Sequence, residues 1–507
     1  MKFEAVRKWW NKNSTFVFCV AIGFGFLNYI YFCTHHVLSP DALHEGQVHI
    51  AGQWEASLGR WGLQFIDRLR GGLVSEWLIV TISILLLALV CVLVVKLFKI
   101  KKKVPAVLLS ALIMLAPQFA ESAMFIYCFD SYCLAMLLAV LAVYLVRDRS
   151  GRFIKIRWGI AFLCIVALCS LYQAYLGVAL GLVLAQFIFD LIKSEKIQQK
   201  VVLKEFLLRV VLIIAAVITY YALTKVILKI TGVQLASYKG ANNSIWTIVS
   251  SAGSSILTAY SDFIRTFFTS SRVVCNIMNY ILMAMILLTA IITLKTREVS
   301  RLILIGIAIL LMPLFVNVMD IIAPGTTINW ITGAGMTVFY MLAMALCDLV
   351  PNKLLYCAGS LAAVMLSRAF LLGNLNSFYA REDVYNNFYT VSSDILTRAY
   401  SIKDYKKGMK FCYNDIIRYE SQFTKSSNKF MARDNETWDN FDGMRDNTAN
   451  FYKRYLGVRV DFCTKDEYKR AVYSAVFKDM PSYPAEGSIK IIDGMVVVKF
   501  NDNVFKL

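Results

Sequence analysis

The chain has 507 residues, of which 58% are hydrophobic and only 17% are charged, and this composition excludes an ordinary water-soluble domain. A net charge of +19 would also suit a nucleic-acid-binding protein, but the basic residues lie in short connections between long apolar runs. The sequence therefore predicts a helical protein whose main partner is a lipid bilayer, and it argues against nucleic acid.

About eleven apolar stretches have the length that a helix needs to cross a hydrocarbon core of roughly 30 Å. The predicted spans are 14–33, 76–95, 104–120, 124–146, 158–172, 174–192, 206–228, 272–294, 302–322, 331–350 and 354–373. The predicted fold class is therefore an all-α polytopic membrane protein, residues 1–373, followed by a small soluble domain, residues 374–507.

Alternate connections between these spans differ sharply in charge. Lys and Arg gather in 2–12, 96–103, 147–157, 193–204 and 295–301, whereas 117–122, 170–175 and 324–329 contain neither. The excess of basic residues marks the cytoplasmic side, so we expect a cytoplasmic N-terminus. An odd number of spans then places the C-terminal domain outside, together with the long loops 34–75 and 229–271.

The first exterior loop concentrates acidic and aromatic residues. Ser39-Pro40-Asp41 has the form of a helix start, with Ser39 as the N-cap and Pro40 at the first helical position. Asp41 and Glu45 would then share one helix face, where a carboxylate acts as a base or simply faces solvent.

Glu55 and Arg60 follow on a segment whose Trp54, Trp61 and Phe65 form an apolar face suited to the membrane interface. The guanidinium of Arg60 has the bidentate donors that bind a phosphate, although an arginine at this depth can also extend to the interface without a ligand.

Among the charged residues inside predicted spans, four are candidates for function, because a charge there needs a partner or a wet cavity. Acids there would suit an acceptor hydroxyl and bases a phosphate, and the alternative is a set of internal ion pairs. The tyrosines and glutamine of the turn at 172–175 would contact a sugar or belong to the interfacial aromatic belt. These candidates are Asp130, Lys225, Asp320 and Arg368, and Tyr172, Gln173 and Tyr175.

The tail beyond residue 374 is rich in polar residues and predicts a small α+β domain. Residues 383–420 have the pattern of an amphipathic helix, and Asp493-Gly494 between two β-branched runs predicts a hairpin. Cys412 and Cys463 lie in this tail, where an oxidising compartment would allow a disulfide between them, with two free thiols as the alternative. The four histidines, all in the first exterior loop, match no known metal spacing, so neither a metal nor a cofactor is predicted.

Several segments resemble the Gtr-type glucosyltransferases of bacteria, in particular the serotype-converting type two group. The segments, which cover most of the chain in order, are PDAL at 40–43, WEASLGRWG at 54–62, FDSYCLAMLLA at 129–139, SLYQAYLGVALGL at 170–182, SYKG at 237–240 and MPSYPAEGSIKIIDGMVVVKF at 480–500.

This resemblance implies a GT-C-like membrane fold in a bacterial inner membrane. It also implies transfer of glucose from undecaprenyl-phosphate glucose to O-antigen or a related surface glycan. Asp41 matches the place of the catalytic base best, with Glu45 as the second candidate, and Arg60 would contact the donor phosphate. Independently of the resemblance, the charges of Lys225 and Arg368 would suit further contacts with that phosphate. Three alternatives remain open: a polysaccharide polymerase, a lipid-linked transferase of another sugar, and a flippase or transporter of lipid-linked glycans.

Overall fold

The computed structural model describes residues 9–147, 153–193, 199–240, 243–294, 299–325, 331–425 and 436–507. Parts of the predicted basic connections 2–12, 147–157, 193–204 and 295–301, and of the connection 324–329, lie outside these ranges. The chain divides into two compact units. The first contains Met1–Cys33 and His49–Asn374, and the second contains Thr34–Val48 and Leu375–Leu507.

Nine helices of the described residues are long and apolar enough to cross a membrane, which confirms the prediction of a helical polytopic membrane protein. They are α2 (Lys12–Thr34), α6 (Glu76–Phe98), α7 (Lys103–Met114) with α8 (Pro117–Met124), α9 (Ile126–Leu145), α10 (Ile154–Leu171), η1 (Gln173–Tyr175) with α11 (Leu176–Lys193), α15 (Val273–Leu294), α16 (Val299–Val316) and α19 (Lys353–Ser401).

Two of the predicted spans fall in described helices outside these nine. The span 206–228 lies in α12 (Gln199–Thr231), a single helix of 33 residues. The span 331–350 corresponds to η3 (Ala334–Met336) and α18 (Thr337–Leu349). Because α18 has only 13 residues, it reaches about 20 Å, which is short for a hydrocarbon core.

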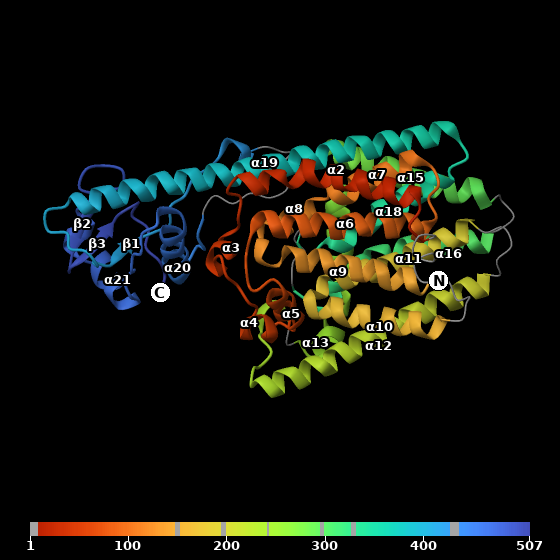
Figure 1. Cartoon of the computed structure of the whole chain (residues 1–507), viewed down its shortest axis with the longest axis horizontal. Helices are drawn as coiled ribbons and strands as arrows, with labels where there is room; N and C mark the ends of the chain where they lie inside the picture. The colour runs from red at the N-terminus through yellow and green to blue at the C-terminus, as the bar shows by residue number, and fades with distance from the viewer. Residues whose placement is uncertain are drawn as a thin grey trace. The chain divides into compact units, whose positions relative to one another are not determined.

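The helices of the first unit pack closely along one another (Figure 1). α9 lies against α6 and α10, while α11 lies against α12, α16 and α18. Glycines make part of this packing possible. A Cβ atom added to either Gly177 or Gly335 would lie 2.3 Å from the Val316 carbonyl oxygen, so a side chain at these positions would force the helices apart.

The second unit combines α3 (Pro40–Glu45), the C-terminal part of α19 and a three-stranded sheet with the order β1-β3-β2. β1 (Phe411–Tyr413) pairs in parallel with β3 (Met495–Val498), and β2 (Ile489–Ile492) pairs antiparallel with β3. Asp493 (φ 50°) and Gly494 (φ 74°) form the turn between β2 and β3, which confirms the predicted hairpin.

The predicted helix at 383–420 is wrong beyond its first half. α19 ends at Ser401, and β1 begins ten residues later. Gly408 between them has φ 90°, a conformation that a helix cannot contain. The apolar residues of β1 are instead buried against β3 in the core of the second unit.

Candidate functional site

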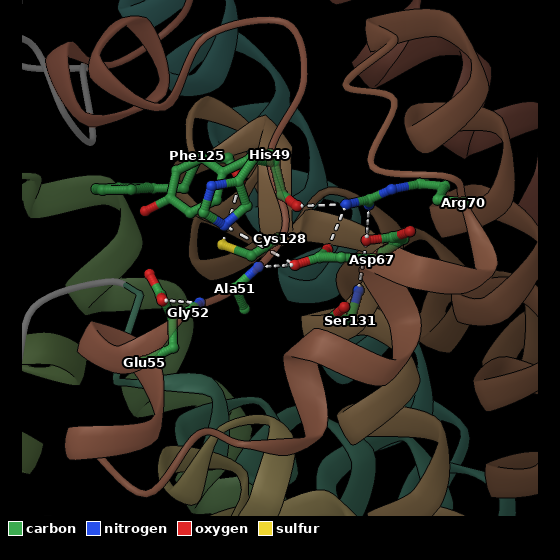
Figure 2. Close-up of polar contacts among 11 residues, drawn as sticks. His49, Ala51, Gly52, Glu55, Asp67, Arg70, Phe125, Cys128 and Ser131 are labelled. Carbon is green, nitrogen blue, oxygen red and sulfur yellow. Dashed lines mark hydrogen bonds and ion pairs between the residues drawn. The ribbon is translucent and has the colours of Figure 1, made fainter. Parts of the chain in front are cut away.

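A buried network of charged side chains joins three segments of the first unit (Figure 2). Asp67 of α5 (Gly62–Leu69) accepts hydrogen bonds from the Ala51 amide at 2.8 Å and from Nη2 of Arg70 at 2.6 Å. Nη1 of Arg70 donates to Oδ1 of Asp130 at 2.6 Å, and Nη2 also donates to the Tyr127 carbonyl oxygen at 2.8 Å. Asp130, expected to contact substrate, is thus held in an ion pair with Arg70.

The burial of this network makes its pairing essential. The side chains of Asp67, Arg70 and Asp130 are each at most 5% exposed, and a buried charge without a partner is strongly destabilising. Burial raises the pKa of Asp67, although the Ala51 amide, Arg70 and His49 all favour its charged form. Nε2 of His49 lies 3.8 Å from Oδ2 of Asp67. The network therefore fixes α5 against the start of α9.

Two glycines allow the turn that carries Arg60 to lie against α10 and α12. Gly59 has φ 77°, and a Cβ atom added there would lie 2.3 Å from the Tyr220 hydroxyl. A Cβ atom added to Gly62 would lie 2.3 Å from Oγ of Ser170. The sequence Leu58-Gly59-Arg60-Trp61-Gly62 is therefore required by close packing as well as by backbone conformation.

Hydrogen bonds hold the same turn in place. Nε2 of Gln173 donates to the Leu58 carbonyl oxygen at 2.8 Å and to the Tyr220 hydroxyl at 2.7 Å. The Tyr220 hydroxyl in turn donates to the Gly59 carbonyl oxygen at 3.0 Å. Gln173, expected to contact a sugar, thus supports the backbone next to Arg60.

Arg60 is the cationic residue that this scaffold presents. Its guanidinium carbon lies 4.4 Å from the centroid of the Tyr172 ring, and Tyr172 stacks on Tyr132 at 4.4 Å between ring centroids. Tyr175 also belongs to this aromatic group, with its ring centroid 6.0 Å from that of Tyr172. Within the described chain, no hydrogen bond or ion pair engages the half-buried Arg60 side chain, and its buried Nε has no acceptor. The guanidinium can therefore bind an anion.

The other predicted residues of the first unit occupy different surroundings. Glu55 is buried, and its Oε2 accepts from the Gly52 amide at 2.7 Å, so its carboxylate caps α4 (Gln53–Ser57). Lys225 is exposed on α12, with Nζ 5.3 Å from the centroid of the Tyr221 ring. Arg368 is exposed on α19. The structure gives neither cation a contact with Arg60.

Asp320 occupies a second buried acidic position. It is 2% exposed in α17 (Val318–Ile322), and neither carboxylate oxygen has a hydrogen-bond partner in the described part of the chain. α17 packs against η1, the element of Gln173 and Tyr175, and against α14 (Ala252–Phe267). An unpaired buried carboxylate is costly, so this position suits a ligand that donates hydrogen bonds.

The second unit holds the remaining candidates. The predicted helix start is confirmed, since Oγ of Ser39 accepts from the Ala42 amide at 3.3 Å and Pro40 begins α3. Asp41 and Glu45 are both half-buried in α3. Cys412 and Cys463 are free, buried thiols, and a hydrogen bond with Cys463 raises the pKa of Cys412.

Sequence reasoning missed Asp67, Arg70 and Tyr132, although one signal pointed to them. An acid predicted inside a span, Asp130, requires a cation nearby, and Arg70 lies among the charged residues of the exterior loop that precedes this span. No group of three or more His, Cys, Asp or Glu side chains among the described residues could hold a metal ion.

A family model described as "Glucosyl transferase GtrII" matches residues 30–347, more than half of the chain. The chain belongs to the glucosyl transferase GtrII family. The predicted resemblance to the Gtr-type glucosyltransferases is therefore confirmed.

The GtrII match includes α3 with Asp41 and Glu45, the turn of Arg60 with its tyrosines, and Asp320. It ends within α18, before α19 and the rest of the second unit. Neither the curated proteins nor the solved structures contain a match to the chain.

Proposed function

We propose that this GtrII-family protein transfers glucose from undecaprenyl-phosphate glucose to O-antigen or a related surface glycan, on the outer face of a bacterial inner membrane. One observation carries the proposal. The Arg60 guanidinium lies on a tyrosine stack without an anionic partner among the described residues. A phosphate supplies that partner, because its oxygens match the bidentate donors of arginine.

The proposed reaction is a single displacement. The carboxylate of Asp41 or Glu45 takes the proton of an acceptor hydroxyl while that oxygen bonds to the anomeric carbon of the glucose. The bond between the anomeric carbon and the carrier phosphate breaks, and its electron pair leaves with the phosphate oxygen. One displacement inverts the configuration at the anomeric carbon.

The leaving phosphate needs stabilisation of charge more than it needs a proton. Arg60 provides a positive charge held against a tyrosine ring, and a positioned charge of this kind stabilises the developing anion. Lys225 and Arg368 are proposed as further phosphate contacts, because their exposed positions on α12 and α19 are accessible to a lipid carrier. The reaction requires no metal or cofactor.

The neutral and acidic residues are proposed to receive the sugar. Asp320 has two buried oxygens that can accept from sugar hydroxyls, and the hydroxyls of Tyr172 and Tyr175 are proposed to bond to the sugar beside Arg60. Glu55, Asp130 and Gln173 already bond within the protein, so their contribution is to hold the substrate-facing residues in place.

The test compares Arg60 variants in proteoliposomes that contain undecaprenyl-phosphate glucose and a purified acceptor glycan. Arg60→Ala should lower transfer by about 10²-fold, the magnitude typical of losing one charge-stabilising group. Arg60→Lys keeps the charge but loses the bidentate geometry, so its rate of transfer should lie between those of Arg60→Ala and the wild type. The matched control is Arg68→Ala, an exposed arginine of α5, which should transfer normally. Normal transfer by Arg60→Ala would overturn the assignment.

A further inference from the structure

A buried ion pair of the second unit holds the segment that precedes α3. Arg381 of α19 donates from Nη2 to the Leu38 carbonyl oxygen at 2.7 Å and to Oε1 of Glu436 at 2.7 Å. Its Nε also donates to the Leu38 carbonyl oxygen, at 3.2 Å. Arg381 is 1% and Glu436 is 5% exposed. The arginine thus connects residue 38 to an acid almost 400 positions further along the chain.

α3 is also held by α20 (Phe441–Phe451). Nδ2 of Asn447 donates to the Pro40 carbonyl oxygen at 3.2 Å, and Nδ2 of Asn450 donates to the His44 carbonyl oxygen at 3.1 Å. Leu43 is buried in the core of the second unit. Contacts from α19 and α20 therefore fix α3 at its start, along one face and at its end.

These contacts decide where the carboxylates of α3 stand. A helix of six residues has no stability of its own in water, so its position depends on what surrounds it. A buried ion pair contributes little net stability compared with apolar packing, but it permits only a narrow range of geometries. The pair is therefore better suited to fixing the Leu38 carbonyl than to stabilising the unit.

We propose that Arg381 and Glu436 are positioning residues for glycosyl transfer, which act by holding the helix of Asp41 and Glu45 in its reactive orientation. This inference rests on the proposed function. It gives the C-terminal residues, which lie beyond the family match, an indirect part in the reaction, through the position of α3. Small misplacements of a reacting group cost about 10²-fold in rate, so loosening this pair should lower kcat.

The test measures transfer and hydrogen exchange on the full-length protein in proteoliposomes. Glu436→Ala removes the hydrogen-bond acceptor of Arg381. Glu436→Gln keeps an acceptor oxygen and should retain most of the wild-type kcat. Arg381→Lys keeps the charge but loses the paired donors. We expect Glu436→Ala and Arg381→Lys to exchange faster at 34–48 and to lose roughly 10–100-fold in kcat, with the donor KM within about threefold of wild type.

Two controls separate positioning from general damage. Glu467→Ala breaks another ion pair of the same unit, between Lys410 and Glu467 at 2.7 Å, and it should leave kcat unchanged. Protection of the sheet residues 489–498 should persist in every variant, which shows that the unit remains folded.

Wild-type kcat in both Glu436→Ala and Arg381→Lys would overturn the positioning role. An Asp41→Asn/Glu45→Gln double variant in the same assay distinguishes this failure from failure of the proposed function. If the double variant also transfers normally, the proposed base is wrong. If it is inactive while the pair variants are active, only the positioning role fails.

Discussion

Asp130 shows how a charged residue inside a hydrophobic helix can serve structure. Its carboxylate binds Arg70, which also binds Asp67, and all three side chains are buried. A substitution of one of these three residues therefore leaves a buried charge of the network without one of its partners.

We expect Asp130→Asn to lower the free energy of unfolding by about 3–5 kcal/mol, because it leaves the buried Arg70 with one carboxylate fewer. The triple variant Asp67→Asn/Arg70→Met/Asp130→Leu removes all three charges and should be less destabilised than Asp130→Asn. Denaturant unfolding in detergent micelles measures both. Equal stability of Asp130→Asn and wild type would show that the ion pair contributes nothing.

Glu436 gives the second unit a dependence on pH. Burial raises its pKa to about 7, against the attraction of Arg381, and Tyr385 also faces it from α19. The pKa of Glu436 in the folded state is above its ordinary value of 4.5. At pH values between 4.5 and 7, the folded state therefore binds a proton at Glu436 that the unfolded state has lost. The free energy of unfolding should therefore fall as the pH rises from 4.5 through 7.

Glu436→Gln lacks this titration. The wild type should lose stability relative to Glu436→Gln when the pH is raised from 5 to 8, as measured by unfolding at both pH values. A difference between the two proteins that stays constant with pH would contradict the raised pKa.

The turn between α4 and α5 is an element whose sequence is set by its neighbours. Gly59 and Gly62 face Tyr220 and Ser170 so closely that any Cβ atom would clash. Gly59→Ala and Gly62→Ala should each lower the free energy of unfolding by about 1–3 kcal/mol. Gly52→Ala in the same loop has no atom within 4 Å of the added Cβ and should behave as wild type in the same unfolding experiment.

Elements defined by local signals could be predicted from the sequence. The apolar spans, the helix start at Ser39-Pro40 and the Asp493-Gly494 turn each depend on a few adjacent residues, and the structure confirms them. The end of α19 could not be predicted this way. Its continuation into β1 depends on pairing with β3, more than 80 residues later in the chain, and no local pattern records that pairing.

The candidate site was predictable only in part, for the same reason. Arg60 and the tyrosines at 172 and 175 could be named because their types suit a phosphate and a sugar. The pairing of Asp130 with Arg70 joins residues 60 positions apart, and the grouping of 34–48 with 375–507 joins the two ends of the chain. Such contacts arise from tertiary packing, which the composition of one segment does not reveal.

For the whole molecule, the charge pattern predicts that the second unit is exported. Cys412 and Cys463 test this prediction. Their backbones are adjacent, since the Phe411 amide donates to Asp461 at 2.8 Å and the Cys463 amide donates to Phe411 at 2.9 Å. In an oxidising compartment we expect these thiols to form a disulfide.

The test alkylates the denatured protein before and after addition of a reductant and measures the modified peptides by mass spectrometry. If the disulfide is present, both cysteines should be alkylated only after reduction. The membrane cysteines, such as Cys91 and Cys347, should react before reduction and serve as controls. Alkylation of Cys412 and Cys463 without reductant would contradict the disulfide.

The identity of the glucose donor tests the account most directly. Purified full-length protein in proteoliposomes should be given an acceptor glycan with either undecaprenyl-phosphate glucose or a nucleotide-linked glucose, and the glycan product measured by mass spectrometry. We predict that glucose is added only from the lipid phosphate and that Arg60→Ala abolishes most of this transfer. Transfer from the nucleotide-linked sugar, or no transfer from the lipid phosphate, would contradict the account.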